Sequence, residues 1–77
     1  MKIQLKLHGP LQKYGKSAGY FELDIKAKTC MISELIAEIG VPASAISFVS
    51  VNGIKQGLHF MLQGGEKITV YPHVVGG

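Results

Sequence analysis

The chain has 77 residues, of which 47% are hydrophobic, and a formal net charge of +3. This length and apolar content predict one domain, residues 1–77, with a compact core rather than a disordered chain. Its lysines are scattered and it has no arginine, so we expect no binding to nucleic acid. Its single cysteine cannot form an internal disulfide, which favours the reducing cytoplasm. It has no apolar run of membrane-spanning length, so we expect no contact with a membrane.

Two segments near the start alternate between polar and apolar side chains. Residues 2–8 and residues 20–25 both show this pattern, which is typical of strands with one buried face. Gly9–Pro10 ends the first segment, and residues 11–19 are polar enough for an irregular connection. We therefore predict an antiparallel strand pair. Its inward-facing residues are Ile3, Leu5, Leu7, Phe21, Leu23 and Ile25.

A helix is the best-marked element of the chain. Thr29 is a suitable N-cap, and Gly40 followed by Pro42 is typical of a helix end. Apolar residues recur at helical spacing between these positions, so we predict a helix from near Thr29 to near Gly40. Its buried stripe should be Ile32, Leu35, Ile36 and Ile39.

Further strands are predicted in the second half of the chain. Residues 48–51 read as a strand, which Asn52–Gly53 ends because this dipeptide favours a tight turn with positive φ. Residues 58–62 are ambiguous between a short strand and a turn that covers the core. Gly64–Gly65 then turns the chain into a last strand, residues 66–71. The inward-facing residues of that strand should be Ile68 and Val70.

The predicted order is strand, strand, helix, strand, strand. A single helix must then cover the apolar face of the sheet. Placing the first and last strands side by side and parallel gives the ubiquitin-like β-grasp. The fold prediction is therefore α+β, a mixed four- to five-stranded sheet wrapped over one main helix.

The C-terminal pair Gly76–Gly77 predicts a functional terminus. A carboxylate on two residues without Cβ atoms can enter a channel too narrow for any side chain. No cap follows the last predicted strand, so residues from about 73 to 77 are expected to be a flexible tail. Five extended residues span roughly 17 Å, which is enough to place the carboxylate inside the active site of another protein.

Several short motifs resemble the MoaD-like proteins, the small subunits of molybdopterin synthase. The ThiS proteins, which are sulfur carriers for thiamine synthesis, share the fold and the Gly-Gly end but usually have a shorter connection after the first strand. Gly65–Glu66 and His73 depart from the family, which often has Gly-Asp and a second proline there. The resemblance rests on residues 2–7, Gly9-Pro10-Leu11, Tyr14-Gly15, Val51-Asn52-Gly53, residues 62–68 and residues 71–77.

This resemblance implies a carrier rather than an enzyme. In the family, an ATP-dependent adenylating enzyme of the MoeB/ThiF type activates the terminal carboxylate, here that of Gly77, and a sulfur donor converts it to a thiocarboxylate. The sulfur then passes to a large synthase subunit of the MoaE type, or to another acceptor enzyme, in the biosynthesis of molybdopterin or a related compound. The chain itself would bind no cofactor, because the ATP is used by the partner, and no metal is expected because its histidines and its cysteine lack the spacing of a metal site. The tail that enters the partner would be Gly76, Val75 and Val74.

An aromatic side chain just before the tail is a candidate partner contact. Tyr71 is predicted on the outer face of the last strand, and Phe48 shares that face if the alternation of its strand holds. Phe60 is a weaker candidate, since its segment is ambiguous. Three other functions stay open: a thiamine-pathway sulfur carrier, a ubiquitin-like modifier joined to lysines through Gly77, and an interaction module with an inert tail.

Overall fold

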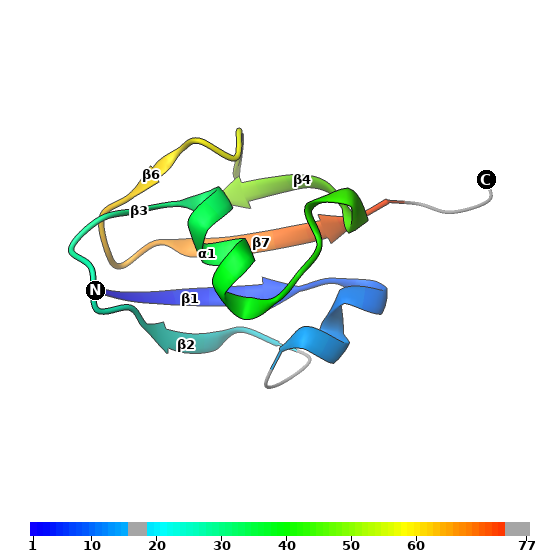
Figure 1. The fold of residues 1–77 in the computed structure, drawn as a ribbon, viewed down its shortest axis with the longest axis horizontal. Coiled ribbons are helices and arrows are strands. Elements are labelled where there is room, and N and C mark those ends of the chain that lie inside the picture. The colour runs from blue at the N-terminus through cyan, green and yellow to red at the C-terminus, as the bar shows by residue number, and fades with distance from the viewer. Residues whose placement is uncertain (16–18, 74–77) are drawn as a thin grey trace.

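The computed structural model describes residues 1–15 and 19–73. It contains a mixed five-stranded sheet of order β2-β1-β7-β4-β5 and a separate two-stranded sheet that pairs β3 with β6 (Figure 1). These architectural features confirm the α+β fold. The strands of the large sheet are β1 (Lys2–Leu7), β2 (Phe21–Asp24), β4 (Ile46–Val51), β5 (Ile54–Gln56) and β7 (Lys67–Pro72).

The first and last strands are neighbours and run parallel, as the β-grasp prediction requires. Leu5 is opposite Ile68, and Leu7 is opposite Val70. The other pairs of the sheet, β1 with β2, β4 with β7 and β4 with β5, are antiparallel. Strand β7 is therefore the central strand, with hydrogen-bonded neighbours on both sides.

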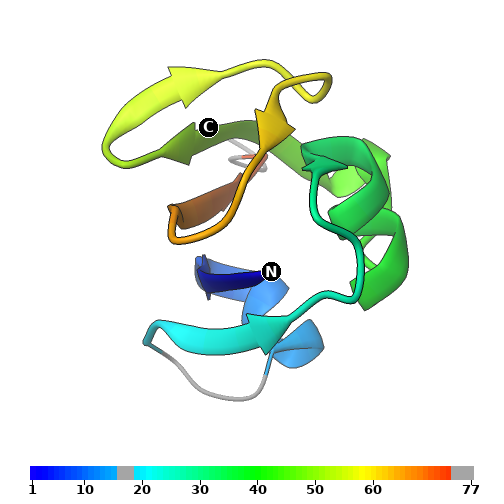
Figure 2. The ribbon, with the colours of Figure 1, turned by 90° about the vertical axis from the view of Figure 1, so that its left-hand side faces the viewer.

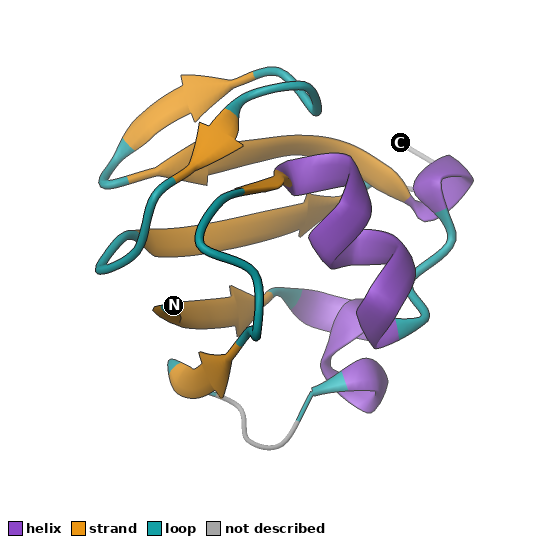
Figure 3. Ribbon diagram, turned by 60° about the vertical axis from the view of Figure 1, so that its left-hand side comes forward, coloured by secondary structure: helices purple, strands orange, loops and turns teal. Residues whose placement is uncertain are grey.

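Helix α1 (Ile32–Ile39) covers one face of the sheet. The strands are seen nearly end-on in Figure 2 with α1 to their right, and α1 crosses in front of the strands in Figure 3. The helix ends at Gly40 in the left-handed region, with φ of 86°, as the sequence predicted. No helix in the described part of the chain is long and apolar enough to cross a membrane.

Thr29 is not the N-cap of the helix predicted to start near it, and α1 begins three residues later, at Ile32. Cys30 and Met31 form β3 (Cys30–Met31), which pairs with β6 (Met61–Leu62), and the N-cap is Met31. The first helical N–H groups, those of Ile32 and Ser33, donate to the backbone carbonyls of Phe60 (3.1 Å) and Leu58 (2.8 Å). A neighbouring loop thus satisfies the donors that a threonine cap would have taken.

The core lies between α1 and the sheet. Ile32, Leu35 and Ile36 are buried as predicted, but Ile39 is only half-buried because it lies in the last turn. Leu62 is fully buried, which settles the ambiguous 58–62 segment as one that covers the core. The residues with the least exposed side chains are Ile3, Leu5, Leu7, Ile32, Leu35, Leu62, Ile68, Val49 and Val70.

Three short elements complete the fold of the described residues. A 3-10 helix, Gly9–Tyr14, occupies the start of the predicted irregular connection and buries Leu11. The turn at Asn52 and Gly53 has positive φ at both residues, 51° and 84°, as predicted, but it leads into β5 and so forms a hairpin. A second 3-10 helix, Ala43–Ala45, precedes β4.

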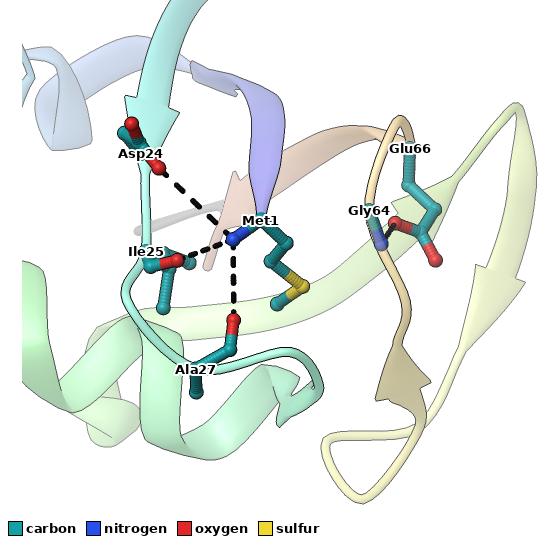
Figure 4. Close-up of polar contacts among 6 residues, drawn as sticks. All are labelled: Met1, Asp24, Ile25, Ala27, Gly64 and Glu66. Atoms are coloured by element: carbon teal, nitrogen blue, oxygen red, sulfur yellow. Dashed lines mark hydrogen bonds and ion pairs between the residues drawn. The ribbon is translucent and has the colours of Figure 1, made fainter.

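Backbone contacts fix the corner where β1 begins (Figure 4). The Met1 ammonium donates to the carbonyls of Ile25 and, at 3.2 Å, Ala27, and it lies 4.0 Å from an Asp24 carboxylate oxygen. The Glu66 carboxylate accepts the backbone N–H groups of Gln63 and Gly64 at 2.8 and 2.7 Å. These contacts set the turn that aligns β7 beside β1.

Candidate functional site

Three rings are stacked on the sheet face opposite α1, near the end of β7. The Tyr71 ring lies 4.4 Å from the Phe48 ring and 4.6 Å from the His8 ring, measured between centroids, and each pair of planes is inclined by only 14°. We call His8, Tyr71 and Phe48 the ring stack. The distances and angles are those of offset or parallel stacking, which adds to the free energy of area burial.

Strand alternation and register build the ring stack. Ile68 and Val70 of β7 point to the helix side, so Tyr71 points to the other side. Phe48 of β4 is directly opposite Tyr71, and His8 follows Leu7, which is opposite Val70. Since β7 lies between β1 and β4, its tyrosine is the middle ring.

A second aromatic group lies on the same face beside the ring stack. The Tyr20 hydroxyl makes a 2.9 Å hydrogen bond with the Thr69 hydroxyl, and Thr69 is only 5% exposed. The Lys6 and Lys67 ammonium groups lie 5.8 and 5.6 Å from the centre of the Tyr20 ring. These cation–π contacts place two lysines close to the tyrosine.

A third lysine flanks the ring stack from the opposite side. The Lys55 ammonium lies 5.3 Å from the centre of the Phe48 ring. Lys55 belongs to β5, which is on the far side of β4 from β7, so it approaches the ring face that Tyr71 leaves free. We use the term outer face for the set His8, Tyr71, Phe48, Tyr20, Thr69, Lys6, Lys55 and Lys67.

The structure brings together two of the three predicted interface residues. Tyr71 is half-buried, and Phe48 is 36% exposed and in contact with it. Phe60 is elsewhere: it packs partly buried against the core, and its carbonyl accepts the first N–H of α1. The predicted tail residues Gly77, Gly76, Val75 and Val74 lie outside the described residues.

His8 and Tyr20 were missed as members of the site, although the sequence contained a signal for both. His8 continues the outward positions of β1, and Tyr20 precedes the inward Phe21. Alternation alone places both on the polar side, but only the strand order shows that they flank Tyr71 and Thr69. The last described residue, His73, donates its backbone N–H to the Ala45 carbonyl at 3.3 Å, so hydrogen bonding extends one residue into the predicted tail.

The described residues include neither a metal-binding cluster nor an exposed cysteine. Among those residues, no group of three or more His, Cys, Asp or Glu side chains could hold a metal ion. The single cysteine, Cys30, is buried, and burial raises the pKa of its thiol above the ordinary value, with a further rise from the carboxylates of Glu34 and Glu38. A raised pKa disfavours the thiolate that nucleophilic chemistry needs.

Comparison with known proteins agrees with the fold. The model of a family described as Mut7-C ubiquitin matches residues 3–75. No curated protein matches the chain. Three solved structures share the architecture over nearly their whole length, at identities that establish the fold alone.

The first of these structures is SAMP1 from Haloferax volcanii, with a TM-score of 0.72, 16% identity and full coverage of both chains. The second is a proposed molybdopterin converting factor, subunit 1, from Pyrococcus furiosus, with a TM-score of 0.69 and 19% identity over 95% of this chain and 98% of that one. The third is a chain from a complex of subunits 1 and 2 of the molybdopterin-converting factor from Helicobacter pylori. Its TM-score is 0.59 and its identity 24%, over the full length of this chain and of that one.

Proposed function

The chain belongs to the Mut7-C ubiquitin family, and on that premise we propose that it is a sulfur carrier protein. In this proposal the Gly77 carboxylate is adenylated and then converted to a thiocarboxylate, which donates sulfur in the biosynthesis of molybdopterin or a related compound. The observation that supports it most is the position of the ring stack, on the central strand whose continuation ends in Gly76–Gly77.

The distance between the ring stack and the terminus suits a carrier. Gly77 follows Tyr71 by six residues, and an extended segment of that length reaches at most about 20 Å. A partner that binds the outer face could therefore receive the terminal carboxylate in an active site nearby. The two glycines would let such a site close tightly around the backbone.

The chemistry needs two balanced steps that the partner catalyses. A carboxylate is a poor electrophile, so an oxygen of Gly77 first attacks the α-phosphate of ATP, which forms the acyl-adenylate and releases pyrophosphate. A sulfide donor then attacks the acyl carbon, the bond to the phosphate oxygen breaks, and AMP leaves. The carbon keeps its oxidation state, so no oxidant or reductant is consumed in either step.

The proposed partners are an ATP-dependent adenylating enzyme of the MoeB/ThiF type and a large synthase subunit of the MoaE type. The similarity to subunit 1 of one converting factor, and to a chain from a complex of subunits 1 and 2 of another, supports the second partner. The chain would act in the cytoplasm, where thiols stay reduced, and would catalyse nothing alone. ATP would be bound by the adenylating enzyme.

The test is to incubate the full chain with the adenylating enzyme of the same genome, ATP and sulfide. We expect release of pyrophosphate, and a rise in the mass of the chain that corresponds to one oxygen exchanged for sulfur. Conjugation to lysines would instead give high-mass adducts.

Two tail variants control the assay. Deleting Gly77 withdraws the carboxylate by about 3.5 Å, and adding an alanine after Gly77 displaces it and introduces a Cβ. Because a misplacement of 1 Å can lower a rate about a hundredfold, both variants should lose at least that much activity while the urea midpoint stays unchanged. Wild-type rates for both would refute the carrier proposal.

A further inference from the structure

The ring stack presents ring edges to its surroundings and keeps the ring faces inside. Both faces of Tyr71 are covered, one by His8 and one by Phe48. Lys55 lies against the remaining face of Phe48. Nucleic-acid bases bind aromatic residues by stacking on free ring faces, and these contacts leave few such faces. The geometry therefore favours contact with a protein over contact with bases.

The exposed chemistry of the outer face is positive. The edge of an aromatic ring carries partial positive charge, and the ammonium groups of Lys6, Lys55 and Lys67 lie around the rings. The Tyr71 hydroxyl makes no hydrogen bond to any other residue that the structure describes, so it can donate one to a partner. The outer face thus offers cations and hydrogen-bond donors.

Three of the five acidic side chains lie away from this surface, and the other two lie at its margin. Glu34 and Glu38 are on α1, on the opposite side of the sheet. The Glu66 carboxylate is engaged by backbone N–H groups of the preceding turn. Glu22 and Asp24 belong to β2, the edge strand, and alternation with the inward Phe21 and Leu23 puts them on the same side of the sheet as Tyr20, at its margin. The carboxylates on this side of the sheet are thus confined to the β2 margin, whereas the three lysines lie around the rings.

We propose that the outer face binds a carboxylate-rich surface of the adenylating enzyme, in which acidic side chains surround an apolar contact for the edges of Tyr71 and Phe48. This inference rests on the proposed function, since it names the chemistry of that partner. Complementary charge would accelerate encounter and fix the orientation of the carrier, while the central aromatic residues would supply most of the affinity.

The experiment compares charge-reversed variants in the activation assay and in calorimetric binding to the same enzyme without ATP. The test variant is Lys55→Glu/Lys67→Glu. Lys26→Glu/Lys28→Glu is the matched control, because it makes the same charge change at exposed positions outside the outer face. Lys55→Arg/Lys67→Arg keeps the charge. Urea unfolding of each variant verifies that the fold is retained.

We expect the test variant to raise KM and Kd by about tenfold or more while kcat stays within about twofold, since the tail chemistry is untouched. The matched control and the arginine variant should behave as wild type. Wild-type association should also slow as salt is raised, and the test variant should lose most of that dependence. Tyr71→Ala should raise Kd at least as much.

The outcomes separate this inference from the proposed function. If the wild type binds the enzyme but releases no pyrophosphate, the carrier function is wrong and the binding data still test the outer face. If the test variant binds as tightly as the matched control, the acidic-surface inference is wrong whatever the activity. Tight binding of a single-stranded oligothymidylate, lost in the same test variant, would also overturn it in favour of a nucleic-acid site.

Discussion

Replacing Leu35 by alanine should destabilise the domain without touching the proposed site. Leu35 is 1% exposed and lies on α1 in the buried cluster. Truncations of this kind cost about 2–5 kcal/mol, with the higher values where the cavity cannot close. The opposing strands β1 and β7 are paired to neighbours, so they should collapse only partly, and we expect about 3 kcal/mol.

That loss is large against the total stability of so small a chain. At about 0.05–0.15 kcal/mol per residue, the domain should have a free energy of unfolding of roughly 4–12 kcal/mol. The assay is urea unfolding followed by far-ultraviolet circular dichroism. With an m-value of about 1 kcal/mol/M, the midpoint should fall by about 3 M.

Glu38→Ala is the matched control, because Glu38 is exposed on the same helix. It should change the free energy of unfolding by no more than about 0.5 kcal/mol. If Leu35→Ala lowered stability no more than Glu38→Ala did, the helix would not be packed against the sheet as described.

Three further perturbations test other parts of the fold. Gly53→Ala should cost about 1–2 kcal/mol in urea unfolding because Gly53 has φ of 84°. Gly57→Ala should cost less, because a Cβ added there would meet open space; equal losses would contradict the turn. Acetylating the Met1 amine should cost about 1–2 kcal/mol by removing the charged donor held by Ile25 and Ala27, and an unchanged midpoint would show that these bonds contribute nothing. Cys30 should react slowly with a disulfide reagent in the folded state, because burial raises the pKa of its thiol and leaves little thiolate at neutral pH. The rate should rise as the pH climbs past the pKa of an ordinary thiol. Labelling of native protein as fast as urea-unfolded protein would contradict that burial.

The sequence predicted the parts of the fold that depend on long periodic patterns. Alternation placed Leu5, Leu7, Ile68 and Val70 in the core, and helical spacing placed Leu35 there. These predictions succeeded because burial on one face of a regular element must repeat with the period of that element. The same alternation placed Tyr71 on the outer face.

The failures concern short segments whose conformation is set by distant partners. The helix begins at Ile32 rather than near Thr29 because residues 58–60 supply carbonyls to its first N–H groups and β6 pairs with β3. Strand β5 is only three residues long and has no periodic signal. His8 and Tyr20 joined the site through strand order, which no local pattern contains.

The central place of β7 has a consequence for how the chain acquires its structure. Strand β7 is the last strand in chain order, yet it alone joins the β1–β2 pair to the β4–β5 pair within the five-stranded sheet. During synthesis on the ribosome, the segment before residue 67 can form hairpins but leaves the edges of β1 and β4 open, and open edges invite pairing with other chains. The contacts that close the sheet also join residues far apart in sequence, which slows folding relative to local contacts. Folding should therefore complete only after β7 has left the ribosome, so that a chain able to present its terminal glycines is one that has already closed its sheet.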